Sequence, residues 1–321
     1  MAVPNVGEIV ATTIANRSKV ISDNVINNTA LLMRMNERGN VRVANGGNVI
    51  AQELSFQENP TAGWYNGYDK LDISPAEVLD YAEFAWKQAA VAVSSSGLDT
   101  IRNSGKAQMI DLIAARVKNA ESTMKNLIST GIYSDGTGAG GKQLTGLAAA
   151  VPTDPTTGTY GGISRATWEF WRSIVSNPSA PTSSTVQGLM NAVYVQLVNG
   201  ADHPDLIVME NTGYLVYLAS LQALQQITDP KLASLGFQSV KYMGGLADVI
   251  LDGGMGGACT TKTMFFLNTD HIFMRPAPGR NMVALPGNRV AIDQDASVQF
   301  LVFAGNITMD SSRHHGRMYW S

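Results

Sequence analysis

The sequence predicts an α+β fold, and three observations carry this prediction. A long amphipathic helix occupies the region before residue 131, helices and strands alternate between residues 164 and 224, and the last third of the chain reads mostly as strands. With 321 residues, one or two domains are expected. Together these features indicate a mixed architecture of at least two parts.

The first 45 residues are polar and asparagine-rich, with a short helix predicted through Ala30–Met35 and ended near Gly39. We expect this segment to lie on another surface rather than to form part of a core. From Asn48 to Gln57, apolar and polar residues alternate with the period of a strand. A second extended stretch runs from about Glu77 to Ser96, so residues 48–95 are interpreted as one long two-stranded excursion around the Asn66-Gly67 turn.

Large aromatic residues gather in this excursion. An isolated hairpin is only marginally stable in water, so one this long needs a surface to lie on. Aromatic side chains with polar tips suit such a contact. The alternative is that they pack within their own domain, which is weighed as near even for Trp86 and less favoured for the turn aromatics. The candidate contact residues are Trp64, Tyr65, Tyr68 and Trp86.

The long helix is predicted from a stripe of apolar residues at steps of three and four, which begins after an N-cap at Ser104 and stops at Gly131. The stripe comprises Ile110, Ile113, Val117, Ala120, Met124 and Leu127. Further helices are predicted after Ser164, over Val186 to Leu197, and through Leu215, Leu218, Leu221 and Leu224, with a buried strand at Leu206–Met209. The C-terminal strands are expected at Ser239–Tyr242, Asp248–Leu251, Met264–Leu267, His271–Met274, Val298–Phe303 and Asn306–Met309.

The glycine-rich turn after the long helix admits two hypotheses. Gly136, Gly138 and Gly141 have the spacing of a dinucleotide-binding loop, which would make the chain an NAD-dependent oxidoreductase. That fingerprint, however, needs a strand before it and a helix after it, and here a helix comes first. The preferred interpretation is a hinge that lets the chain leave the long helix.

Other chemistry has little support in the sequence. The adjacent His314 and His315 would point to opposite faces of a strand, and no neighbouring histidine or cysteine completes a metal site. Cys259 has no recognisable base, and Asp293 with Asp295 suits a solvated edge. We therefore expect no catalytic residue, no metal and no cofactor.

The composition limits which kinds of partner and compartment the chain is suited to. Charged residues make up only 15% of the chain, which leaves a neutral polar surface such as partners can cover, although one large core would give the same figure. The formal net charge of -3 provides no broad basic field for nucleic acid. One cysteine suits a reducing compartment, and no apolar run is long enough for a membrane span or a signal peptide.

Several motifs in order resemble the major capsid protein of tailed bacteriophages, whose shell fold is shared by herpesvirus capsid floors and encapsulins. They are Asp23-Asn24-Val25 with Leu31-Leu32, Gly46-Gly47-Asn48 leading to Trp64-Tyr65-Asn66-Gly67-Tyr68, Phe84-Ala85-Trp86, Asn103-Ser104-Gly105-Lys106 before the long helix, Tyr133-Ser134-Asp135-Gly136-Thr137-Gly138, and Gly161-Gly162-Ile163 with Trp168. No single motif is specific; their order and spacing carry the resemblance, most strongly over residues 20–175.

The resemblance implies four parts: an N-terminal arm over 1–45, an extended loop over 46–96, a peripheral domain with a spine helix over 97–147 and 258–321, and an axial domain over 148–257. It implies hexamers and pentamers of an icosahedral shell around the phage genome, made in the host cytoplasm. Portal and decoration proteins would be partners, and without an assembly domain before the arm a separate scaffolding protein is expected. Lys70 lies where some relatives form a covalent cross-link, although a solvated lysine is the preferred interpretation. An encapsulin-like cellular compartment is the alternative.

Overall fold

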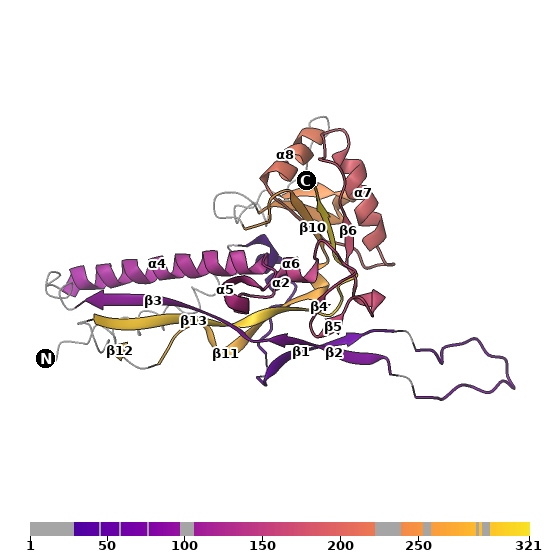
Figure 1. Ribbon diagram of the computed structural model, residues 1–321, viewed down its shortest axis with the longest axis horizontal. Coiled ribbons are helices and arrows are strands. Elements are labelled where there is room, and N and C mark those ends of the chain that lie inside the picture. Colours follow the sequence, from indigo (N-terminus) through magenta and orange to yellow (C-terminus); the bar gives the residue numbers. More distant parts are fainter. Residues whose placement is uncertain are drawn as a thin grey trace.

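The chain was analysed as a computed structural model that describes residues 29–44, 46–57, 59–75, 77–96, 106–221, 239–252, 258–286, 289–290 and 296–321. Two sheets organise these residues (Figure 1). A four-stranded sheet lies beside the long helix α4, and a six-stranded sheet lies under the helices α7 and α8. A hairpin, β1 with β2, projects away from both, so the molecule is elongated with one slender extension (Figure 1).

The first described helix, α2 (Ala30–Glu37), is part of the core. Its apolar residues Leu31, Leu32 and Met35 are all buried in the main hydrophobic cluster. The predicted helix and its end are confirmed, because Gly39 adopts a φ of +72° directly after it. The expectation that this segment stays out of a core is wrong for residues 30–37, because five of its eight residues supply apolar burial. Residues 1–28, including Asp23-Asn24-Val25, lie outside the described residues.

The hairpin is shorter than the sequence suggested. Strand β1 (Val49–Ser55) pairs antiparallel with β2 (Leu79–Ala85), from Val49 opposite Ala85 to Ser55 opposite Leu79. The next strand, β3 (Lys87–Ser96), leaves the hairpin and pairs along β13 instead. The interpretation of residues 48–95 as one two-stranded excursion is therefore wrong from residue 87 onward. The change of partner follows a break at Trp86, where neither strand continues.

The long helix is α4 (Lys106–Ile132), and it packs against β3 and β13. Val117, Ala120 and Met124 are buried as predicted, but Leu127 is 46% exposed and Ile128 takes its place in the stripe. Gly131 does not stop the helix. It lies within the last turn of α4, and the lack of a side chain lets Leu144 pack closely there, since a Cβ would lie 3.0 Å from the Leu144 side chain. Ser104 lies outside the described residues.

The six-stranded sheet has the order β6-β14-β10-β7-β9-β8. The strands are β6 (Ile174–Ser176), β7 (Leu206–Met209), β8 (Ser239–Tyr242), β9 (Ala247–Leu251), β10 (Thr263–Leu267) and β14 (Gly316–Tyr319). Strand β7 is buried on both faces, since Leu206 and Val208 belong to one hydrophobic cluster and Ile207 and Met209 to the other. This explains its uninterrupted apolar sequence.

Helices α7 (Val186–Leu197) and α8 (Asn211–Ser220) cover one face of that sheet. Both were predicted, but Leu215 of the expected stripe is 66% exposed, while Tyr214 and Tyr217 are buried; Leu218 and Leu221 pack partly buried against the same core, and Leu224 lies outside the described residues. The helix predicted after Ser164 is wrong. The chain forms only the short η1 (Glu169–Trp171) and then β6, because Ile174 joins the sheet edge beside β14.

The four-stranded sheet centres on β13 (Ala296–Met309), with β3 on one side and β11 (Ile272–Ala284) and β12 (Arg289–Val290) on the other. The strands predicted at 298–303 and 306–309 are one strand, and β14 was not predicted. Because β10 and β14 join the six-stranded sheet, the domain boundary predicted at residue 258 does not follow the sheets. The remaining short elements are α5 (Gly138–Gly141), α6 (Leu147–Ala150), β4 (Thr159–Tyr160), β5 (Ile163–Ser164), η2 (Met243–Gly245) and η3 (Thr269–His271).

Candidate interaction surfaces

The loop at the end of the hairpin carries the largest exposed aromatic side chains among the described residues. Trp64 and Tyr68 are fully exposed, Ile73 is 91% exposed, and Tyr65 and Leu71 are also largely in solvent. These residues lie beyond the paired part of β1 and β2, in the section that extends furthest from the body (Figure 1). Monomeric proteins seldom expose such groups of apolar residues, and a contiguous patch of them indicates a binding surface.

Short local hydrogen bonds shape this loop. The predicted turn at Asn66-Gly67 is confirmed: the Asn66 N–H donates to the Asp69 carboxylate at 2.8 Å, and the Asp69 N–H donates to the Asn66 carbonyl at 2.8 Å. Asp72 likewise accepts from the Ser74 N–H at 2.9 Å. Lys70 is exposed. The loop thus has defined turns without packing against the rest of the described chain.

Trp86 occupies a different place from the loop aromatics. It lies at the base of the hairpin, half-buried against the main core, and its indole N–H donates to the Gly47 carbonyl at 2.9 Å. Its role in contacts between subunits remains a prediction. Of the four aromatic residues predicted from the sequence, the structure brings Trp64, Tyr65 and Tyr68 together on one loop and sets Trp86 apart.

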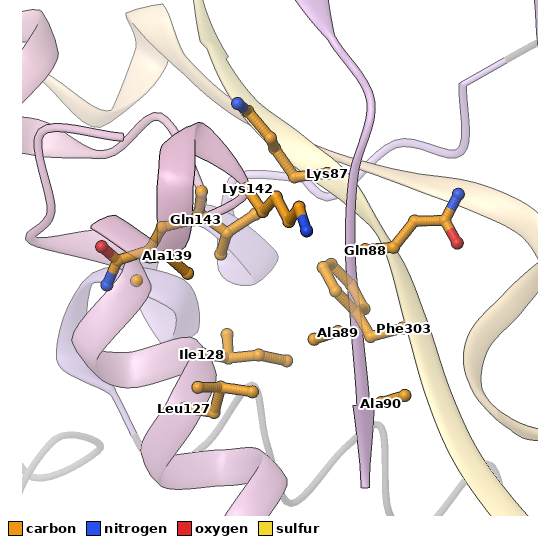
Figure 2. Close-up of a pocket in the computed structure, with 12 residues that line it drawn as sticks. Lys87, Gln88, Ala89, Ala90, Leu127, Ile128, Ala139, Lys142, Gln143 and Phe303 are labelled. Atoms are coloured by element: carbon orange, nitrogen blue, oxygen red, sulfur yellow. The ribbon is translucent and has the colours of Figure 1, made fainter. Parts of the chain in front are cut away.

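A pocket of about 400 Å³ lies between α4, the glycine-rich turn and strand β3 (Figure 2). Leu127 and Ile128 face it from the helix, and Phe303 closes it from β13. Two cations stand at its rim: Lys142 is exposed, and Lys87 donates its ammonium to the Gly141 carbonyl. The pocket therefore offers an apolar floor with a positively charged edge. Sequence periodicity could not reveal it, because its walls come from separate segments of the chain, of which Phe303 lies more than 150 residues from the others.

The glycine-rich turn forms part of this pocket. Gly136 and Gly141 both adopt a φ of +80°, which residues with a side chain seldom reach. Gly138 is held differently, since an added Cβ would lie 2.1 Å from the Gln143 side chain. The backbone conformation thus favours glycine at Gly136 and Gly141, whereas at Gly138 the flexible end of the Gln143 side chain could move aside for a methyl group. Whether they act as a hinge remains a prediction.

The turn does not have the geometry of a dinucleotide site. The 27-residue helix α4 precedes it where a strand is required, and only the four-residue helices α5 and α6 follow. Neither offers the long helix that would direct its N-terminus at a pyrophosphate. The NAD hypothesis therefore has no geometric support in the described residues.

The thiol of Cys259 is buried, and its burial raises the pKa well above the usual range. A buried, protonated thiol is a poor nucleophile. Asp252 beside it accepts a hydrogen bond from the hydroxyl of Tyr133, at the end of α4. Burial raises the pKa of Asp252 to about 6. Asp293 and Asp295 lie outside the described residues.

The histidines are arranged as sequence spacing could not foresee. His314 and His315 lie in the turn before β14 and not on a strand as expected. His315 is buried and its Nδ1 accepts from the Asn268 N–H at 3.3 Å, while His314 stacks on His271 with ring centroids 4.3 Å apart. Asp202 joins His271 and His314 to form one cluster of possible ligands. Since 43 positions separate the two stacked residues, only the fold brings them together.

No protein-family model and no curated protein sequence matches the chain. Solved structures do match. A chain of the cyanophage A-1(L) capsid asymmetric unit is 16% identical, with a TM-score of 0.66 over 86% of this chain and 89% of its own length. The capsid of the native GTA particle gives 10% identity and a TM-score of 0.55 over 89% of this chain and 90% of that one. The capsid of Myoviridae phage XM1 gives 12% and 0.50 over 89% and 91%.

The chain has the phage capsid fold. The α+β class expected from the sequence is confirmed, and so is the resemblance to tailed-phage capsid proteins at the level of fold. The exposed hairpin loop and the pocket beside α4 are the two candidate interaction surfaces on this fold. Among the described residues, no helix combines the length and the apolar character that crossing a membrane would require.

Proposed function

We propose that this chain is the structural subunit of an icosahedral shell that encloses a phage genome. The observation that carries the proposal is the hairpin loop, whose apolar side chains are exposed and do not pack against the described part of the chain. The solved structures with the same fold are phage capsid structures. A subunit of that fold with an unsatisfied projecting loop suits self-association in hexamers and pentamers better than it suits catalysis.

The loop of one copy would lie on the pocket beside α4 of its neighbour. Residues 59–80 carry four acidic side chains and one lysine, whereas Lys87 and Lys142 stand at the rim of the pocket. Trp64, Tyr65 and Tyr68 would supply apolar contact to the floor formed by Leu127, Ile128 and Phe303. Complementary charge favours the correct register, and buried aromatic area supplies most of the affinity.

Contacts of this kind are individually modest and collectively strong. An interface on the order of 1,000 Å² or more, repeated around each ring, would stabilise a closed shell while single contacts remain reversible during assembly. The net charge of -3 suits a wall that lies near packaged DNA without binding it tightly. Scaffolding, portal and decoration proteins would complete the virion, with the subunit made in the host cytoplasm.

Deleting residues 60–73 and joining the ends with a short glycine-serine linker tests the loop. The expected result is a folded subunit, with unchanged far-UV circular dichroism, that elutes as a small species and forms no shells in negative-stain micrographs. Normal particles from this variant would refute the interface role. Particles that contain nucleic acid support a genome shell, whereas empty particles that hold a protein cargo would point to an encapsulin-like compartment.

A charge reversal tests the pocket. Lys142→Glu should impair shell closure, because it places a carboxylate against the acidic loop of the neighbour. Lys118→Glu is the matched control, since Lys118 is an exposed lysine of α4 that does not line the pocket. Equal loss of particles in both variants would show that net charge, rather than this pocket, governs assembly.

A further inference from the structure

Three segments that are distant in sequence meet at one cluster of ligand-type side chains. Asp202 lies in the tight turn after α7, held by paired backbone hydrogen bonds with Asn199 at 2.8 and 3.0 Å. His271 ends η3, and His314 lies in the connection between β13 and β14. One ligand atom from each of the three residues lies within 4.8 Å of those of the other two.

Each imidazole is already oriented by a partner on its other nitrogen. His271 donates from Nδ1 to the Asp310 carboxylate at 2.8 Å, and the Nδ1 of His314 is hydrogen-bonded to the Ser311 hydroxyl at 2.7 Å. Because Nδ1 is engaged in each ring, Nε2 is the nitrogen that a metal ion would bind, with the proton held at Nδ1. A carboxylate or hydroxyl on the distal nitrogen is the arrangement that typically orients histidine ligands of a metal and raises their basicity.

We propose that Asp202, His271 and His314 form a binding site for a divalent transition-metal ion of the zinc class. Two imidazole nitrogens and one carboxylate oxygen are a ligand set that zinc accepts in tetrahedral geometry, with water in the fourth position. Calcium and magnesium prefer oxygen ligands alone, so two nitrogens disfavour them. Asp202 is exposed and both histidines are only partly buried, which leaves a path for the ion from solvent.

Binding would change the cluster in a defined way. The two rings are stacked with an angle of 14° between their planes, and an imidazole lone pair lies in the plane of its ring. Parallel rings cannot both direct their lone pairs at one ion, so coordination replaces the stack with a tilted pair. Bonds of about 2.0 Å to each ligand also draw the three groups closer together.

The ion would connect the two sheets of the fold. Asp202 follows α7, which covers the six-stranded sheet, whereas His271 directly precedes β11 of the four-stranded sheet, and His314 lies in the connection between β13 of that sheet and β14 of the six-stranded one. A metal that joins them restrains movement of one sheet against the other. This property is independent of whether the chain forms a shell, since all three ligands belong to one subunit.

The test uses the full chain, treated with chelator and then exchanged into chelator-free buffer at pH 7.5. Zn²⁺ alone is titrated by calorimetry, and Co²⁺ is added separately because its visible absorption reports nitrogen and oxygen ligands in tetrahedral geometry. The expected result is one ion per chain with a dissociation constant in the micromolar range or tighter, and a higher unfolding midpoint with Zn²⁺ present. No saturable binding below 1 mM would overturn the proposal.

Variants assign the site to these residues. Asp202→Asn and His314→Gln should each weaken Zn²⁺ binding at least tenfold, and Asp310→Asn should weaken it by about tenfold through the orientation of His271. His203→Gln is the matched control: it removes a histidine next to Asp202 whose Nδ1 contacts Tyr194 and Pro204 rather than the cluster. Unchanged affinity in Asp202→Asn and His314→Gln, or an equal loss in His203→Gln, would overturn the assignment. Because Asp202 is exposed, its variant remains informative even if His314→Gln fails to fold.

Discussion

Two groups of aromatic residues at opposite ends of the hairpin show how differently one chain uses the same residue types. At the base, Phe84 of β2 packs on Tyr160 with ring centroids 5.2 Å apart, and Tyr160 packs on Trp171 at 6.0 Å; all three are buried. At the tip, Trp64 and Tyr68 are fully exposed. The aromatic side chains at the base are buried by residues of their own subunit, whereas those at the tip are left uncovered by the described residues.

The two ends depend on each other. The base fixes the direction of the hairpin, because Glu83 of β2 donates its N–H to the Gly161 carbonyl at 2.9 Å, next to the aromatic cluster. A tip without a rigid base would sample many directions and lose entropy on docking. We infer that changes at the base alter the stability of the subunit, whereas changes at the tip alter only assembly. The predictions below run from the largest expected change in subunit stability to the smallest.

Trp171→Ala should destabilise the subunit by about 3–5 kcal/mol, because it opens a large cavity in the core and removes the hydrogen bond from the Trp171 indole to the Tyr160 carbonyl at 2.9 Å. Urea unfolding of unassembled subunits, followed by circular dichroism, measures this free energy. Trp171→Phe is the control: it keeps most of the apolar volume and should lose less. A loss below about 1 kcal/mol in Trp171→Ala would contradict the importance of the base.

The burial of the Asp252 carboxyl should make the stability of the subunit depend on pH. Burial raises its pKa to about 6 in the folded chain, while the unfolded value is near 3.8. The folded state therefore binds the proton more tightly, so the contribution of this group to stability is present below pH 4 and is lost as pH rises through 6. The difference is on the order of 3 kcal/mol, measured as the free energy of unfolding from pH 4 to 7.

The variant Asp252→Asn should remove this part of the pH dependence, since its amide oxygen still accepts from the Tyr133 hydroxyl but does not titrate. Asp72 of the hairpin loop is the comparison: a hydrogen bond from the Ser74 side chain lowers its pKa, and it is exposed. Between pH 5 and 7, Asp72→Asn should leave the pH profile of unfolding unchanged, because a carboxyl whose folded pKa lies below 3.8 is ionised in both the folded and the unfolded state there. An unaltered slope in Asp252→Asn would contradict the role assigned to its burial.

Two glycines, one in the packed body and one in the exposed loop, allow the same comparison with a smaller expected change in stability. A Cβ at Gly146 would lie 2.2 Å from the Ile132 carbonyl oxygen at the end of α4, and backbone there cannot easily move. Gly146→Ala should therefore cost about 2 kcal/mol or more in subunit stability. Gly63→Ala in the loop is the control, because nothing lies within 4 Å of its position. Equal unfolding midpoints for the two variants would argue against close packing at Gly146.

Sequence periodicity correctly predicted those helices and strands whose own pattern of apolar residues shows which faces are buried. The stripe of α4, the alternation of β1 and the apolar run of β7 follow directly from which faces are covered. It failed where a partner strand decided the structure: Ile174 and Val175 fit a helical stripe, but the edge of β14 makes them a strand. Nor could it foresee that Lys87 to Ser96 would leave the hairpin, because pairing with β13 depends on residues 200 positions away.

The candidate surfaces divide in the same way. The aromatic residues of the loop could be selected from the sequence, because a turn with three large aromatics has no local means of burying them. The pocket beside α4 and the cluster of Asp202, His271 and His314 could not, since each joins segments that no periodicity relates. Residue type alone did not predict the position of Trp86. A tryptophan suits an interface, but this one lies at the hairpin base, where its indole N–H donates to the Gly47 carbonyl.

The smallest change in subunit stability is expected at the tip. Trp64→Ala removes a side chain that is fully exposed among the described residues, so the free energy of unfolding should stay within about 0.5 kcal/mol of the original. The protein concentration needed for shells should nevertheless rise at least about tenfold, because truncation of an aromatic interface anchor commonly costs 2 kcal/mol or more. Light scattering across a dilution series measures that threshold. Leu215→Ala is the matched control, an apolar residue 66% exposed on α8, away from the loop and the pocket. If both variants shifted the threshold alike, or if Trp64→Ala destabilised the isolated subunit, the distinction between a self-sufficient base and a partner-dependent tip would fail.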